Sequence, residues 1–99
     1  MVILNVTAIV EESVKDAFLN YMQSVHIPAV MASGKFEEHL LFQLTEPVNE
    51  GFTFCAQYIA DSKENLNAFR LADEKNLQTQ LQAEFGNQVL CFSSILEKI

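Results

Sequence analysis

Two histidines and two cysteines are the side chains of this sequence with the most versatile chemistry. No Cys-x-x-Cys or His-x-x-x-His spacing joins them, so we expect no metal site. His26 lies two residues before Pro28, where a helix break leaves backbone carbonyls without donors. Its imidazole therefore has two alternative roles, as a structural cap of those carbonyls or as a general base. His39 follows Glu37–Glu38 and is predicted to be a solvated residue at the sheet margin.

Cys55 and Cys91 are predicted to remain free thiols. The strands expected to carry them are separated by a third strand, which places them roughly 10 Å apart, beyond the ~7 Å limit for a disulfide. Neither has a base or a helix N-terminus beside it in the sequence, so we expect inert packing residues in a reducing cytoplasm.

Composition excludes several classes of partner. Acidic residues outnumber basic ones by 13 to 6, and the net charge of −7 disfavours binding to nucleic acid or to anionic membranes. The apolar opening lacks the basic segment of a signal peptide, and no stretch approaches the roughly 20 apolar residues of a membrane span. We therefore expect a cytoplasmic protein, with residues 1–99 forming one domain.

The positions of these residues depend on six predicted elements. Alternating apolar residues predict strands, and apolar residues at helical spacing predict helices, with a break near residues 26–27 that Pro28 imposes on the first helix. The elements are strand 2–10, a helix from Ser13 to near Gly34, strands 36–45 and 52–61 joined by a turn at 47–51, a helix from Ser62 to Gly86, and strand 88–96. This β-α-β-β-α-β order predicts an α+β, ferredoxin-like antiparallel sheet of strand order 4-1-3-2, with both helices on one face.

The other face of this sheet is predicted to be open and free of charged side chains. Such a face is unusual on an acidic protein, and a second copy related by a two-fold axis would cover it, giving a homodimeric α/β barrel. The alternative is a monomer with an uncharged, solvated sheet. We expect the face to contain Asn5, Thr7, Ile9, His39, Leu41, Gln43, Thr45, Thr53, Cys55, Gln57, Ile59, Val89, Cys91, Ser93 and Ile95.

Four polar residues of this face are candidates for binding a small molecule: Asn5, Thr7, Gln43 and Gln57. The alternative is that they only hydrogen-bond across the dimer or to trapped water.

Several segments resemble a short bacterial domain family of unknown function. The resemblance covers nearly the whole chain and is most specific in the run from His26-Ile27-Pro28 to Gly34-Lys35-Phe36, with further matches at residues 3–7, 57–58 and 85–86. That family is similar to the ferredoxin-like dimeric α/β barrels, which include cofactor-independent monooxygenases and proteins of ether degradation. The resemblance implies the fold and the dimer but no particular activity.

Three functions are compatible with the sequence, and we expect no cofactor for any of them. The first is a homodimeric binding or interaction module, in which the interior of the barrel or a cleft at the first helix holds a small molecule or nothing. The second is a cofactor-independent enzyme of the monooxygenase or isomerase type, in which His26 is the general base and Asn5, Gln43 or Gln57 stabilises an oxyanion. The third is a structural assembly partner. Composition does not choose among them.

Overall fold

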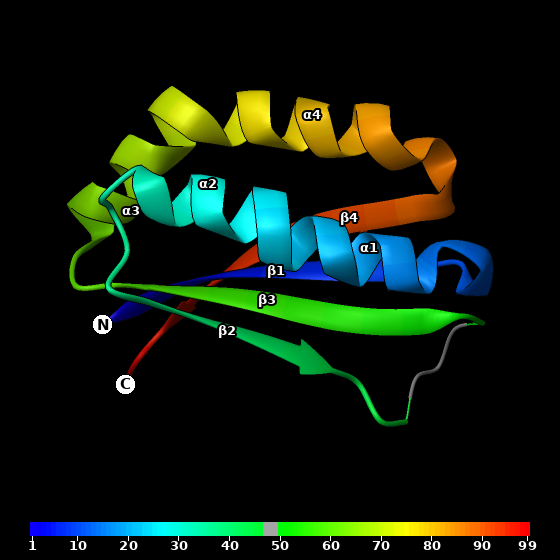
Figure 1. Cartoon of the computed structure of the whole chain (residues 1–99). Helices are drawn as coiled ribbons and strands as arrows, with labels where there is room; N and C mark the ends of the chain where they lie inside the picture. Colours follow the sequence, from blue (N-terminus) through cyan, green and yellow to red (C-terminus); the bar gives the residue numbers. More distant parts are fainter. Residues whose placement is uncertain (47–49) are drawn as a thin grey trace.

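The protein is a two-layer structure in which helices cover one face of a four-stranded antiparallel sheet (Figure 1). The computed structural model describes residues 1–46 and 50–99. The predicted turn at 47–51 therefore lies partly outside the described residues. The strands are β1 (Val2–Val10), β2 (Glu38–Gln43), β3 (Phe52–Ala60) and β4 (Val89–Glu97), and the α-helices are α1 (Lys15–Tyr21), α2 (Ile27–Ala32), α3 (Lys63–Phe69) and α4 (Lys75–Phe85).

The sheet has the strand order β2-β3-β1-β4, which is the order expected from the sequence read from the opposite edge. β1 and β3 are the inner strands, and their alternation of apolar and polar residues places one set of side chains beneath the helices. In β1 the buried positions are Val2, Leu4, Val6, Ala8 and Val10, as predicted.

A π-helical turn, Met22–His26, joins α1 to α2. In this turn the backbone N–H of Ile27 donates to the carbonyl oxygen of Met22, five residues earlier, and Pro28 lies in the first turn of α2. Proline has no N–H to donate, so it is tolerated at the start of a helical segment and not in its middle. The kink or pause predicted near residues 26–27 corresponds to this π-helical turn, through which the backbone stays helical, and Gly34 follows the helix with a φ of 75°.

The second helical segment begins and ends where the sequence predicted. The Ser62 hydroxyl accepts a hydrogen bond from the backbone N–H of Asn65 at 3.2 Å, which satisfies one of the free donors of the first turn. A second π-helical turn, Arg70–Glu74, connects α3 to α4, and Gly86 ends α4 with a φ of 58°.

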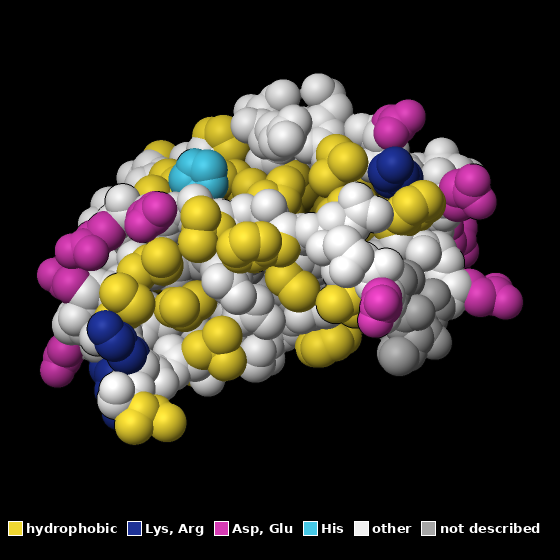
Figure 2. Space-filling model, turned by 90° about the horizontal axis from the view of Figure 1, so that it is seen from below, with side chains coloured by type: hydrophobic (Ala, Val, Ile, Leu, Met, Phe, Trp, Pro, Cys, Tyr) yellow, Lys and Arg dark blue, Asp and Glu magenta, His cyan; other side chains and the backbone are white. Residues whose placement is uncertain are grey.

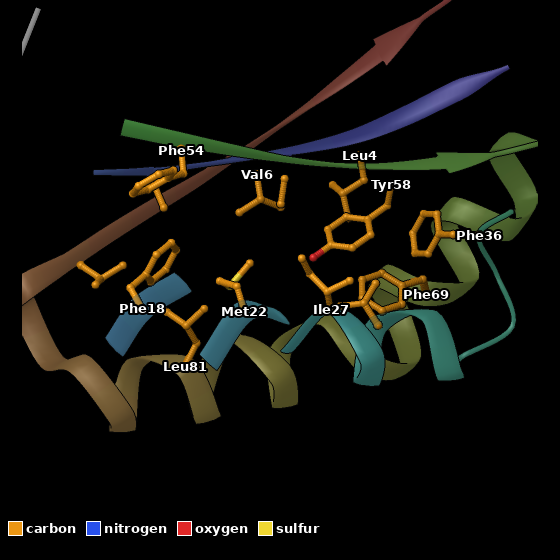
Figure 3. Close-up of a cluster of buried hydrophobic side chains, with 14 of the residues drawn as sticks. Leu4, Val6, Phe18, Met22, Ile27, Phe36, Phe54, Tyr58, Phe69 and Leu81 are labelled. Atoms are coloured by element: carbon orange, nitrogen blue, oxygen red, sulfur yellow. The ribbon is translucent and has the colours of Figure 1, made fainter. Parts of the chain in front are cut away.

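Aromatic and aliphatic side chains together fill the space between the layers (Figure 3). The Phe18 ring lies 5.7 Å from that of Phe54 and thereby joins α1 to β3. At the other end of the core, the Phe36 ring lies 5.5 Å from Tyr58 and 5.0 Å from Phe69. Rings at these separations contribute beyond the area that they bury, and they hold the helices on this one face of the sheet.

The edge strand β2 is rotated relative to the prediction, so its two faces are exchanged. Leu41 pairs with Ala56, which is buried beneath the helices, and the pairing begins with a 2.8 Å hydrogen bond from the Glu37 N–H to the Ile59 carbonyl. Residues 40–42 are all apolar, so alternation alone did not determine the side that faces the core. The residues that face the helices are His39, Leu41 and Gln43, and those on the open face are Leu40, Phe42 and Leu44.

In the other edge strand, β4, the two faces are also exchanged relative to the prediction. Val89 pairs with Val10, and the two side chains are 1% and 0% exposed, so this register position lies under the helices. A backbone hydrogen bond of 3.0 Å from the Glu11 N–H to the Gln88 carbonyl holds this register. The helix-facing residues are therefore Val89, Cys91, Ser93 and Ile95, and the open face receives Leu90, Phe92, Ser94 and Leu96.

None of the helices within residues 1–46 and 50–99 is long and apolar enough to cross a bilayer.

Candidate functional site

The open face of the sheet is more apolar than the sequence predicted. Phe42 is 49% exposed, and Leu90 and Phe92 are each 57% exposed. Figure 2 shows hydrophobic side chains gathered over the middle of this side of the molecule, with most charged side chains toward its ends. The face is made by Ile3, Asn5, Thr7, Ile9, Leu40, Phe42, Leu44, Thr53, Cys55, Gln57, Ile59, Leu90, Phe92, Ser94 and Leu96, with Glu38 at one end.

A row of polar side chains crosses the middle of this apolar face. The Gln57 amide donates to Asn5 Oδ1 at 3.3 Å, and the Asn5 amide donates to Ser94 Oγ and to Thr7 Oγ1, each at 3.3 Å. The Thr7 hydroxyl lies 3.8 Å from the Cys55 thiol. The row exists because Gln57, Asn5 and Ser94 occupy one register position of three adjacent strands. We call these five residues the polar row.

The polar row keeps some of its hydrogen-bonding capacity for another molecule. Asn5 uses both amide hydrogens and its oxygen within the row. Among the residues that the structure describes, Gln57 uses one amide hydrogen, in the bond to Asn5, so its carbonyl oxygen and second amide hydrogen remain for another partner. The candidates Asn5, Thr7 and Gln57 therefore lie together. Ser94 was not predicted, because the pattern of β4 favoured Ser93 on this face, whereas the observed register pairs Ser94 with Asn5.

Gln43 does not belong to this group. It pairs with Phe54, whose side chain is buried beneath the helices, so Gln43 lies on the helix-facing side of the edge strand and is exposed there. The expectation that it lines the same surface as Asn5 and Gln57 is wrong because the register of β2 is shifted by one residue relative to that expectation.

His26 is buried in the helix layer, with only 4% of its surface exposed. Its ring centroid lies 6.4 Å from that of Tyr21, and its side chain makes no capping hydrogen bond at the start of α2. Burial lowers the pKa of His26 to about 4, because the charged form would lose its hydration. The imidazole is therefore neutral at pH 7.

The space beside His26 is too small for a substrate. The His26 side chain borders a cavity of about 10 Å³, whose other walls include Met22, Leu41 and Cys91. A single water molecule needs at least ~10–15 Å³. Val6 and Ala8 of β1 also line this cavity, whereas Asn5 and Thr7 point to the opposite side of the same strand. The structure thus separates His26 from the polar row by the thickness of the sheet.

The two cysteines also lie on opposite faces of the sheet. Cys55 pairs with Thr7 on the open face, whereas Cys91 pairs with Ala8 on the helix-facing side, contrary to its expected position. Both are free, as predicted. Burial raises the pKa of the Cys91 thiol to about 11.

We expect two reactive thiols per unfolded chain and a slow Cys91 in the folded protein. Raising a thiol pKa from 9 to about 11 lowers its thiolate fraction at pH 8 by roughly a hundredfold. Alkylation with iodoacetamide, followed residue by residue by mass spectrometry, measures this. An intact mass lower by two hydrogens before reduction, or rapid labelling of folded Cys91, would contradict the expectation.

A second hollow lies on the helix-facing side, between α2 and β2. It has a volume of about 420 Å³. His39 contributes to it, so this residue lines a cleft and is not on the open face as expected. The lining residues are Gln23, Ile27, Pro28, Met31, His39, Leu40 and Leu41. Across residues 1–46 and 50–99, no group of three or more His, Cys, Asp or Glu residues is arranged to hold a metal ion.

Solved structures share this fold at low sequence identity. An ethyl tert-butyl ether d (ethd) family protein from Bacillus halodurans C-125 is similar over 100% of both chains, with 17% identity and a TM-score of 0.71. HapK from Hahella chejuensis has 11% identity and a TM-score of 0.71, covering 100% of this chain and 93% of that one. A dimeric ferredoxin-like protein from an uncultured marine organism has 12% identity and a TM-score of 0.69, covering 100% of this chain and 95% of that one.

These similarities show the ferredoxin-like α+β fold and do not assign an activity. No curated protein matches the sequence. The resemblance identified from the sequence is confirmed at the level of the family, because a family model matches residues 1–99, the whole chain. The chain belongs to the family described as domain of unknown function (DUF4286).

Proposed function

We propose that the protein is a homodimeric module in which two sheets face each other as a dimeric α/β barrel and bind a small molecule between them. The observation that carries this proposal is the open face, on which apolar side chains surround the polar row. Four strands about 4.8 Å apart and ~20–30 Å long give a face of roughly 500 Å². The polar row is part of this area, and the whole face is comparable in size to the largest apolar patches that monomers expose.

A second copy is the occupant that best fits this face. A two-fold axis brings the same patch of both chains together, so the apolar surface needs no other partner to be covered. Each chain carries a net charge of −7, yet among the paired strand positions of this face Glu38, at one end, is the one charged residue. Repulsion between two copies is therefore kept away from the centre of the contact. A solved neighbour of the same fold is described as a dimeric ferredoxin-like protein, which supports the proposal.

The polar row gives the interior of such a dimer its binding chemistry. Once covered, the free amide hydrogen and carbonyl oxygen of Gln57 need hydrogen-bond partners, because buried polar groups are costly when left unpaired. A small molecule that carries both a donor and an acceptor would supply them. The competing role, pairing between the two rows or with trapped water, predicts a dimer without ligand binding.

The enzymatic alternative with His26 as general base lacks a supporting observation. A base works best with a pKa near the operating pH, and burial holds that of His26 at about 4. Its cavity of about 10 Å³ cannot admit a substrate, and Asn5 and Gln57 lie across the sheet. We therefore favour the binding module.

Light scattering and a thermal-shift screen test the two parts of this proposal. At micromolar concentration we expect a mass twice that of the 11.2 kDa chain. In a screen of polar metabolites we expect at least one to raise the Tm of the native protein by several degrees. Gln57→Leu should abolish that rise, whereas the matched variant Gln43→Leu, on the opposite side of the sheet, should keep it. A native monomer would overturn the dimer. A dimer with no stabilising metabolite, or with a rise that Gln57→Leu leaves intact, would overturn the binding role.

A further inference from the structure

We infer that the cleft between α2 and β2 is a second binding site, for an uncharged and mainly apolar molecule of one or two rings that carries one hydrogen-bonding oxygen. This inference goes beyond the proposed dimer and its interior. The cleft opens on the helix-facing side of β2, whereas the polar row lies on the opposite side of the sheet; of the residues that line the cleft, Leu40 alone occupies an open-face position of this edge strand.

The cleft lies where the helical segment that ends in α2 does not fully cover the edge strand β2. On the helix side, Gln23, Ile27 and Met31 are spaced four residues apart, and Pro28 lies beside Ile27. On the sheet side, His39 and Leu41 occupy alternate, helix-facing positions of β2. β2 is a short edge strand, and its faces are poorly covered: Leu41 is half-buried and His39 is exposed.

The π-helical turn contributes to this gap. It inserts a wider turn before Pro28, and π-helical turns occur frequently at functional sites. Within the turn, His26 and Met22 are buried in the core, while Gln23 stays exposed at the cleft. The sequence feature that breaks the helix thus shapes one wall of the cleft.

The size and lining of the cleft define the class of ligand. Its volume of about 420 Å³ lies within the ~300–1,000 Å³ typical of small-molecule sites. Five of the seven lining residues are apolar, and none is Asp, Glu, Lys or Arg. A charged ligand would therefore lose hydration without gaining a counter-charge. The Gln23 amide and the His39 imidazole are the two side chains that can hydrogen-bond an oxygen of the ligand.

An NMR titration with 2-naphthol, an uncharged two-ring molecule with one hydroxyl group, tests this inference. We expect saturable shifts of the backbone amides of residues 23–27, 29–31 and 39–41. The anion 2-naphthoate, similar in ring size but charged, should bind at least tenfold more weakly. The double variant Gln23→Leu/His39→Leu removes both hydrogen-bonding side chains from exposed positions and should weaken 2-naphthol binding about tenfold. Gln43→Leu, farther along the same face of β2, should leave the affinity unchanged.

A charged residue in the cleft gives a second readout. Met31→Glu should abolish 2-naphthol binding, whereas the control Met31→Leu should retain it. If Met31→Glu fails to fold in circular dichroism, the double variant at exposed positions carries the test. Absence of saturable shifts, equal affinity for 2-naphthoate, or an unchanged affinity in the double variant would each overturn the inference.

The same titration separates this site from the proposed dimer interior. Shifts confined to residues 5, 7, 57 and 94 would place the probe on the open face and overturn the cleft site while leaving the dimer intact. A native monomer that still binds 2-naphthol at residues 23–31 would overturn the proposed dimer and support the cleft site.

Discussion

Phe92→Lys is expected to convert the protein from a dimer to a monomer. Phe92 is 57% exposed and pairs with Thr7 in the middle of the open face, so in the proposed dimer its ring would be covered by the second copy. A two-fold interface would bury two lysines at once, and an unpaired charge in an interface costs several kcal/mol. We therefore expect the dissociation constant of the dimer to rise at least a thousandfold. Sedimentation velocity over a range of concentrations measures it.

Leu71→Lys is the matched control for this experiment. Leu71 is an apolar residue that is 90% exposed in the π-helical turn Arg70–Glu74, within the helix layer and away from the open face. We expect this variant to remain a dimer. Both variants should retain the unfolding free energy of the single chain, because both residues are exposed in it. If Phe92→Lys dimerises as tightly as the native protein, or Leu71→Lys dissociates equally, the sheet-to-sheet contact is wrong.

The stability of the folded protein is expected to fall by about 3 kcal/mol as the pH decreases from about 6.5 to about 4, because of His26. Its pKa is about 4 in the folded state and 6.5 ordinarily, so in this interval the unfolded chain binds a proton that the folded chain does not. The unfolding free energy therefore rises with pH through this window and is constant with respect to His26 above it. Urea denaturation at half-unit pH steps measures the dependence.

Two variants distinguish the contribution of His26 to this pH dependence from that of carboxylates that titrate in the same pH range. His26→Gln removes the titrating ring, and its stability should lose most of the dependence between pH 4 and 6.5. His39→Gln removes the exposed histidine and should keep it. If His26→Gln shows the same dependence as the native protein, the imidazole is solvated or charged in the fold, and a role for it in chemistry would again be open.

The sequence predicted the elements because their signals are local. Pro28 cannot donate a backbone hydrogen bond, so the hydrogen-bond pattern of the first helix had to change beside it, and the π-helical turn ends at His26. Ser62 and Gly86 act through the side chain and backbone of a single residue at a helix end. The β-α-β-β-α-β order then allows few topologies, and the observed strand order is the one expected.

The candidate residues were predicted correctly only on the inner strands. In β1, apolar positions alternate with Asn5 and Thr7, so burial of one set determines the other face. Gln57 follows because it pairs with Asn5. These three residues lie together in the polar row, as the sequence indicated, and Ser94 joins them from an edge strand.

The edge strands were decided by the tertiary structure. Apolar side chains occur on both faces of β2 and β4, so hydrophobicity does not distinguish a strand from its copy shifted by one residue. The backbone hydrogen bonds of Glu37 with Ile59 and of Glu11 with Gln88 select one register. That choice puts Phe92 on the open face and turns Gln43 and Cys91 toward the helices. A one-residue shift reverses every side chain of a strand, and the pairing that prevents it joins residues far apart in the chain.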